Sequence, residues 1–567
     1  FGSTVISPGP PVVTQGNSAI EILNDPTNVT FNGGLISGRN PTAPTRSPTG
    51  GIEIFNTTGT IAFNGTTIID NEPLDTTDPR FDPPPAQAPL DIMQATGPVS
   101  FNVLTVQNAG ELATGEPAVF VNNSGDITFN ELNVRFNGIT GALLAAVDIS
   151  NSGVITAHGG TIDSSSPTTA GGAQAIRLVN NDRIAWTSDT IRSEVDILGI
   201  LVQGQPGSFV VRGRGGAGSG GFINVTTTGA IFDYTGQDPT DPGNFVELHD
   251  MAFANNLQAI TATNLNRLLI DNSTFSSNGG PGIRLSDVVN FTIEDSFLTG
   301  NAGNVIFATV GINPTDTVFK YRFERNRFVD GFGTSNSSMI RIDNVAGGVG
   351  AALDLVVRNN GDPLSGFTGF VSNRNNPNIA NPALIDESSA FAVRWNGPVP
   401  QAIFDGNSFA LIGGAGQEGV EFINASTTHV TNLFFRGNTL STNEAGDSFG
   451  LKVDLANRGH VQIVDNRTLN TPGTPFRGFN LNGARDQAYQ LTLRGANNRV
   501  VLTNNEVQAF NDDIIAFNFP YIGGNTEFFI NGNLVRFNEQ FTACGPGERG
   551  FVFRPIVGTM FFNGTVN

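Results

Sequence analysis

Residues 118–132 read AVFVNNSGDITFNEL, and residues 146–160 read AVDISNSGVITAHGG. Each stretch has a short run in which apolar and polar residues alternate, then a corner of Asn, Ser and Gly, and then a second alternating run. Alternation with a period of two is the pattern of a half-buried β-strand. Because the two stretches begin 28 residues apart, they predict one structural unit that is repeated along the chain.

The same unit recurs from one end of the sequence to the other. In the first part its apolar anchors are 24 to 38 residues apart, at Ile20, Ile52, Leu90, Val119, Val147, Ile176 and Ile200. In the second part the expected anchors are Val420, Leu451, Phe479 and Ile515, and the corners read RNRF at Arg325, GNSF at Gly406, GNTL at Gly437 and DNRTL at Asp465.

The repeat predicts a coil of strands. Parallel strands usually need a helical crossover, but no long amphipathic helix separates these runs, so each coil must return one rung higher. Asn and Gly tolerate the left-handed backbone of tight corners, and stacked Asn side chains can hydrogen-bond between rungs. We predict an all-β chain forming a single right-handed parallel β-helix of roughly 19–20 rungs with loop insertions. A β-propeller, with blades of about 40–45 residues, fits the period less well.

The repeat style changes near residues 204–221. Residues 1–204 are expected to form a β-helix in the first style, and residues 205–567 continue the same solenoid with Asn corners. Insertions rich in Pro and Gly follow Arg39, Asp70 and Arg212, and another begins at Tyr234. Because Pro and Gly disfavour strand pairing, we expect these insertions to project as loops.

Composition limits the classes of partner. Charged residues are 14% of the chain, the formal net charge is −20, and Lys320 and Lys452 are the only lysines. An acidic, lysine-poor surface argues against nucleic acid as a partner. The single cysteine, Cys544, excludes an intramolecular disulfide and multi-cysteine zinc sites, and we expect it to be a buried thiol. The sequence contains no run of about 18 apolar residues, so we expect no transmembrane segment.

Neither end of the sequence contains a recognisable capping helix. The last rung of a β-helix exposes an open row of backbone donors and acceptors over its apolar column. We therefore expect the chain to form a homo-oligomer or polymer through its solenoid ends or lateral faces.

One motif resembles a known family. FSSNGGPGI at Phe275 is similar to repeats in the passenger domains of autotransporters and in polymorphic outer-membrane proteins. The N-x-F corners resemble the wider right-handed β-helix family of bacterial surface proteins, pectate lyases and polygalacturonases. The resemblance covers nearly the whole chain. It implies the fold and a bacterial extracellular or cell-surface location. The unbroken solenoid, the low lysine content, the acidic balance and the missing catalytic residues favour a structural or adhesive function, with self-assembly into a filament, sheath or layer.

Two alternative functions remain. One is a polysaccharide lyase or hydrolase, or a carbohydrate-binding β-helix; the other is a phage tailspike-type shaft. The GHG and RIK motifs of polygalacturonases are missing, and RGH at Arg458–His460 is the nearest match. Asp512 and Asp513 are adjacent and would face opposite sides of a strand. We therefore predict no catalytic or cofactor-binding residue and no enzymatic activity.

Carboxylates in two loops are candidates for a structural calcium ion. Asp75, Asp78 and Asp82 lie in one loop, and Asp238 and Asp241 lie in another. Their oxygens suit Ca²⁺, although the compact spacing of a dedicated calcium loop is missing. No other cofactor is expected. The four histidines, His158, His249, His429 and His460, fall on separate rungs without a metal-binding spacing.

Overall fold

The computed structural model describes residues 4–6, 20–37, 51–70, 88–109, 117–136, 145–165, 174–194, 198–311, 317–329, 338–344, 350–362, 367–372, 389–411, 418–442, 449–466, 479–481, 487–509, 515–537, 549–554 and 560–563. This described part is all-β, with no helix and 65% strand. The predicted parallel β-helix is therefore confirmed. The chain divides into two compact units, Phe1–Thr274 and Phe275–Asn567.

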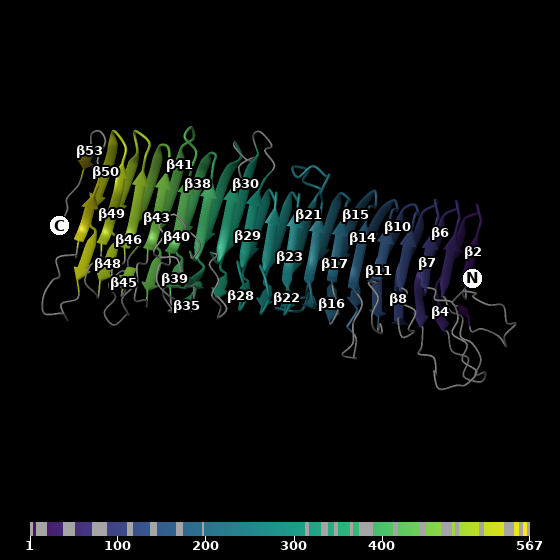
Figure 1. Cartoon of the computed structure of the whole chain (residues 1–567). Helices are drawn as coiled ribbons and strands as arrows, with labels where there is room; N and C mark the ends of the chain where they lie inside the picture. Colours follow the sequence, from purple (N-terminus) through teal and green to yellow (C-terminus); the bar gives the residue numbers. More distant parts are fainter. Residues whose placement is uncertain are drawn as a thin grey trace. The chain divides into compact units, whose positions relative to one another are not determined.

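Each rung contributes strands to three parallel sheets, which we call sheets I, II and III in chain order (Figure 1). In the first unit, sheet I contains β2 (Ile20–Leu23), β5 (Ile52–Phe55), β7 (Leu90–Met93), β9 (Val119–Asn122), β11 (Ala145–Ser150), β14 (Gln174–Val179), β17 (Leu198–Gln203), β20 (Thr228–Asp233) and β23 (Gln258–Thr263). Sheet II contains β3 (Val29–Phe31), β12 (Val154–Ala157), β15 (Arg183–Ser188), β18 (Gly207–Val211), β21 (Phe245–His249) and β24 (Arg267–Asp271).

Sheet III of the first unit contains β1 (Thr4–Ile6), β4 (Gly34–Ser37), β13 (Thr161–Asp163), β16 (Thr190–Glu194), β19 (Gly221–Asn224) and β22 (Met251–Ala254). Three long strands serve sheet II with their first halves and sheet III with their second halves: β6 (Ile61–Asp70), β8 (Val99–Ala109) and β10 (Ile127–Phe136). Strand β25 (Thr274–Ser276) spans the boundary between the units in the sequence.

In the second unit, sheet I contains β26 (Ile283–Ser286), β29 (Ile306–Val310), β32 (Ile340–Asn344), β37 (Phe391–Trp395), β40 (Glu418–Asn424), β43 (Phe449–Leu455), β46 (Gln487–Leu493), β49 (Ile515–Ile522) and β52 (Arg549–Phe553). Sheet II contains β27 (Asn290–Glu294), β30 (Val318–Glu324), β33 (Ala352–Arg358), β38 (Val399–Asp405), β41 (Thr431–Arg436), β44 (Gly459–Val464), β47 (Arg499–Thr503), β50 (Thr526–Asn531) and β53 (Met560–Asn563).

Sheet III of the second unit contains β28 (Phe297–Thr299), β31 (Arg327–Val329), β36 (Phe370–Ser372), β39 (Ser408–Leu411), β42 (Thr439–Thr442), β45 (Phe479–Leu481), β48 (Glu506–Ala509) and β51 (Leu534–Phe537). The short strands β34 (Gly361–Asp362) and β35 (Phe367–Thr368) form an antiparallel pair. Among the described residues sheet I has nine strands in each unit, close to the predicted number of rungs.

The predicted anchors of the first part are confirmed by the register of sheet I. Ile20 pairs with Ile52, and the alignment continues rung by rung through every predicted anchor to Ile200. In the second part Val420 pairs with Leu451, as expected. The next members are Tyr489 and Phe517, so the anchors Phe479 and Ile515 are wrong. Phe479 lies in sheet III, where the motif GFNL has the same alternation as a strand that opens a rung.

The core is a column of apolar side chains that point inward from all three sheets. In the first unit the rings of Phe31, Phe63, Phe101 and Phe129 stack on successive rungs, with centroids 4.5–5.6 Å apart. The rungs therefore share one core, and each rung is buried by its neighbours.

Buried polar side chains connect successive rungs at their corners. In the first unit they lie between sheets I and II: Ser124 N donates to Ser152 Oγ at 3.1 Å, Ser152 N to Asn181 Oδ1 at 3.1 Å, and Asn181 N to Gln205 Oε1 at 2.9 Å. In the second unit the corresponding buried polar side chains lie at the corner between sheets II and III. The division of repeat style at residues 204/205 lies directly before Gln205, the last member of this first series, and as a domain boundary it stays a prediction.

The series in the second unit is an asparagine ladder: Asn326, Asn360, Asn407, Asn438, Asn466, Asn505 and Asn533. The Nδ2 group of each of the first six donates to the Oδ1 atom of the next asparagine at 2.7–3.3 Å. Each Nδ2 group also donates to a backbone carbonyl of the preceding rung at 2.7–3.0 Å. The predicted hydrogen bonding between stacked asparagines is confirmed.

A left-handed residue precedes each member of the asparagine ladder. The φ angles lie between 53° and 66° at Arg325, Asn359, Gly406, Gly437, Asp465, Asn504 and Gly532. Only glycine adopts this conformation without steric cost, and asparagine and aspartate come next. This requirement explains why the corners read GN, NN, DN or, at Arg325, RN.

Candidate functional site

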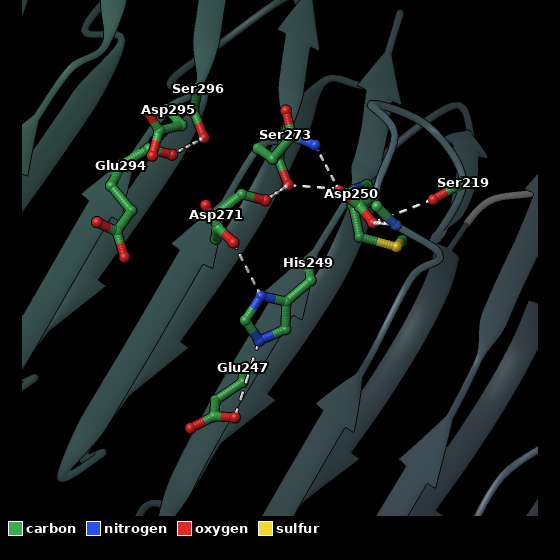
Figure 2. A network of polar contacts seen from close by, with 12 residues as sticks. Ser219, Glu247, His249, Asp250, Asp271, Ser273, Glu294, Asp295 and Ser296 are labelled. Carbon is green, nitrogen blue, oxygen red and sulfur yellow. Dashed lines mark hydrogen bonds and ion pairs between the residues drawn. The ribbon is translucent and has the colours of Figure 1, made fainter.

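The glycine-rich loop that follows β18 is held by one carboxylate. Asp250 is buried and lies between β21 and β22 in the left-handed conformation, with φ of 59°. Its Oδ2 atom accepts hydrogen bonds from Gly215 N at 2.6 Å and Ser219 Oγ at 3.1 Å, and its Oδ1 atom accepts one from Asn272 Nδ2 at 2.5 Å (Figure 2). The loop is thus fastened to the next rung by a charged side chain.

Burial by itself would raise the pKa of Asp250, but hydrogen bonds from Asn272, Gly215, Ser219 and Arg214 lower it below its ordinary value. A carboxylate with a lowered pKa in the folded state stabilises the fold above its ordinary pKa of about 4, and the stabilisation is lost as the pH falls through the lowered value. The attachment of this loop is therefore complete at neutral pH.

We expect the substitution Asp250→Asn to release residues 213–219. Hydrogen bonds to a charged acceptor contribute about 1.5–3 kcal/mol each, so losing one should speed amide exchange in this loop by about tenfold or more. Hydrogen-exchange mass spectrometry measures this rate. Asp238→Asn is the control, because Asp238 caps a different loop. Unchanged exchange of residues 213–219 in Asp250→Asn would contradict the role of Asp250.

A second polar cluster, the His249 cluster, lies on the outward face of sheet II in the first unit. It consists of Glu247, His249, Arg267 and Asp271. Alternation turns Val246 and Leu248 of β21 into the core and leaves Glu247 and His249 facing outward. His249 is in register with Asp271, and its Nδ1 atom lies 3.2 Å from Asp271 Oδ2 (Figure 2).

The other ring nitrogen of His249 also faces a carboxylate. Its Nε2 atom lies 3.8 Å from Glu247 Oε2, and Glu247 also forms an ion pair with Arg267. A catalytic histidine of the triad type needs one nitrogen for an orienting carboxylate and the other for a nucleophile. The nearby hydroxyls are used elsewhere, since Ser219 Oγ bonds Asp250 and Ser273 Oγ donates to the carbonyl of Asp271. The cluster has the geometry of an ion network that joins β21 to β24.

A third cluster lies on sheet I of the second unit, where two glutamates of β40 are fully buried. Lys452 Nζ lies 3.0 Å from Glu421 Oε1 and 3.7 Å from Glu418 Oε1. Arg394 NH2 lies 3.6 Å from Glu421 Oε2, and Ser389 Oγ donates to Glu418 Oε2 at 3.2 Å. Two cations thus compensate the two carboxylates, because a buried charge is costly unless it is paired.

The carboxylates of Asp238 and Asp241 serve the turns of their own loop. Asp238 Oδ1 accepts hydrogen bonds from the backbone and hydroxyl of Thr240 at 2.8 and 2.7 Å, which lower its pKa. Asp241 Oδ1 accepts one from Gly243 N at 2.8 Å. In the part of the chain that the structure describes, no group of three or more His, Cys, Asp or Glu side chains could hold a metal ion. Asp75, Asp78 and Asp82 lie outside that part, and the calcium site stays a prediction.

The remaining candidate residues are separate from these clusters. His158 is exposed, and His429 Nδ1 lies 2.9 Å from Ser426 Oγ within a turn. Asp512, Asp513 and Cys544 lie outside the described residues. The spacing of the histidines did not predict the pairing of His249 with Asp271, because Asp271 comes from the next rung.

The outward face of sheet II in the second unit carries a row of apolar side chains. Successive members align rung by rung, and we call them the apolar row: Val356, Ile403, Phe434, Val501 and Phe529, with Gln462 between Phe434 and Val501. All but Val356 are half-buried. Solvent-facing positions of a sheet are usually polar, so an apolar row indicates a surface for contact.

Comparison with models of known protein families, with curated proteins and with solved structures finds no match. The resemblance to bacterial surface β-helices therefore stays a hypothesis. Among the described residues, no helix is long and apolar enough to cross a membrane.

Proposed function

We propose that this chain is an extracellular structural or adhesive protein of the bacterial cell surface, similar to the passenger domains of autotransporters. The apolar row carries the proposal. It lies on a sheet whose strands are held in register by the buried asparagine ladder at one corner. A rigid, repeated face with aligned apolar side chains suits contact with an extended partner or with a second copy of the chain.

The charged clusters support a structural function over an enzymatic one. The His249 cluster connects two neighbouring strands of sheet II, and Lys452 connects two neighbouring strands of sheet I. In both clusters the acids are engaged by cations or by a histidine ring of an adjacent strand. Such networks fix the register of the repeat and leave the outward faces for contact.

Assembly of the purified chain tests the proposed function. We expect sedimentation velocity in physiological salt and negative-stain microscopy to show filaments, layers or other oligomers. The double variant Phe434→Ser, Phe529→Ser should reduce this assembly by removing two members of the apolar row. Phe120→Ser is the matched control, since Phe120 faces outward from sheet I of the first unit. A monomer at high micromolar concentration, together with no attachment to bacterial cell surfaces, would refute the proposal.

A further inference from the structure

Two arginines and a histidine gather on sheet II of the second unit. Arg458 directly precedes β44, and His460 is two residues later, so both face outward from the same strand. His460 is in register with Arg499, the first residue of β47. Arg458 and Arg499 are exposed, and both lie close enough to lower the pKa of His460, after burial of the ring, which is the larger cause. We call these residues the cation cluster.

Among the described residues, the cation cluster has no carboxylate partner. None of its three members forms an ion pair with another described residue, and His460 Nε2 is a buried nitrogen without a hydrogen-bond partner in the described part of the chain. Glu527 is in register with Arg499 and is exposed, but the two groups are not within ion-pair distance. Nearby Asn432 uses its amide to donate to the carbonyl of Pro400 at 2.9 Å.

The first unit contains an arginine in a position that matches Arg499. Arg267 is also the first residue of a sheet II strand, and its guanidinium also lies over a phenylalanine ring, 4.7 Å from the centroid of Phe245. Arg499 lies 4.9 Å from the centroid of Phe529 in the same way. The difference is that Arg267 forms an ion pair with Glu247. Among the described residues, Arg267 is thus neutralised by an acid and Arg499 is not.

Like charges placed together repel, and acids outnumber bases in this protein by 50 to 30. Two neighbouring arginines that form no ion pair with another described residue indicate a place where an external anion supplies the missing charge. The cluster also adjoins the apolar row, because Gln462 and Val501 follow His460 and Arg499 by two residues and face the same way.

We propose that Arg458, His460 and Arg499 form a binding site for the acidic groups of an anionic polysaccharide. The arginines bind carboxylate or sulfate oxygens through charge-assisted hydrogen bonds. The apolar row beside them packs against the uncharged faces of the sugar rings. A nucleic acid is disfavoured, because two arginines neutralise few phosphates and the net charge of −20 repels a dense polyanion. This binding site would serve the proposed adhesive function, and the choice of a cell-surface polysaccharide as its ligand rests on that function.

Binding of dextran sulfate and carboxymethyl dextran tests this proposal, with unmodified dextran as the uncharged probe. We expect the two anionic dextrans to bind the whole chain and unmodified dextran to bind far more weakly. Arg499→Gln and Arg458→Gln should each weaken binding by about tenfold or more, since each removes a charged donor. Arg267→Gln is the matched control and should bind like the original chain. Binding should also weaken at 1 M salt, where charges are screened beyond about 3 Å.

A second readout reports on the site itself. The ring resonances of His460 should shift on addition of carboxymethyl dextran, whereas those of His158 on the first unit should not. Equal binding by Arg499→Gln and Arg267→Gln, with unshifted His460 resonances, would overturn the proposal. If inorganic sulfate at the same charge concentration competes for the site as well as the anionic dextrans do, the ligand is not a polysaccharide. Neither result bears on the assembly that tests the proposed function.

Discussion

Replacing Asn438 with leucine is expected to lower the free energy of unfolding of the second unit by about 4 kcal/mol, because several buried polar groups lose their partners at about 1–3 kcal/mol each. Asn438 Oδ1 accepts hydrogen bonds from both Asn407 N and Asn407 Nδ2 at 3.0 Å. Its Nδ2 group donates to the carbonyl of Phe404 at 2.9 Å. Leucine has nearly the same size but supplies neither a donor nor an acceptor.

Urea denaturation followed by circular dichroism measures this loss. Asn504→Gly is the matched control, because Asn504 lies at the corner position that glycine already occupies at Gly406, Gly437 and Gly532. Its side chain is half-buried and makes one hydrogen bond, from Nδ2 to Asp465 Oδ1 at 2.9 Å, so the control should cost about 1 kcal/mol or less. Similar midpoints for Asn438→Leu and the original chain would show that the ladder is not a main source of stability.

Replacing Lys452 with methionine is also expected to lower the free energy of unfolding strongly. The substitution keeps the length of the side chain and removes the ammonium group that lies 3.0 Å from Glu421 and 3.7 Å from Glu418. Removing one partner from a buried ion pair costs about 3–5 kcal/mol, and we expect about 3 kcal/mol because Lys452 is not fully buried. Thermal and urea unfolding measure the change.

The other lysine of the chain provides the control. Lys320 is exposed on sheet II, and Lys320→Met should leave the unfolding midpoint nearly unchanged. If both methionine variants unfold alike, the glutamates are compensated by other groups and the role of Lys452 is smaller than the geometry indicates.

Much of the fold could be predicted from sequence because the repeat is local. The anchors from Ile20 to Ile200 align in the structure as their spacing predicts, since each lies in the alternating strand that precedes a recognisable corner. The error at Phe479 has a physical cause. Strands of sheets I and III bury the same alternating face, so a glycine followed by alternating apolar residues does not distinguish the two sheets.

The clusters were harder to predict because contacts join residues from different rungs. His249 and its partner Asp271 are 22 residues apart, whereas Asn360 and Asn407 are 47 apart, since insertions lengthen some rungs. One signal was present. GVEF at Gly419 and GLKV at Gly450 place Glu421 and Lys452 at the same position of the repeat, and the structure pairs them. Aligned motifs therefore predict contacts that fixed spacing does not.

The asparagine ladder also bears on how such a chain can change its length. Asn438 and Asn466 occupy equivalent places in neighbouring rungs, 28 residues apart, and each follows a left-handed residue. Excising the 28 residues 438–465 would bring Gly437 directly before Asn466, and the ladder would close with every donor still facing an acceptor. Recombination between repeats could thus remove or add whole rungs while the hydrogen bonds of the asparagine ladder stay continuous.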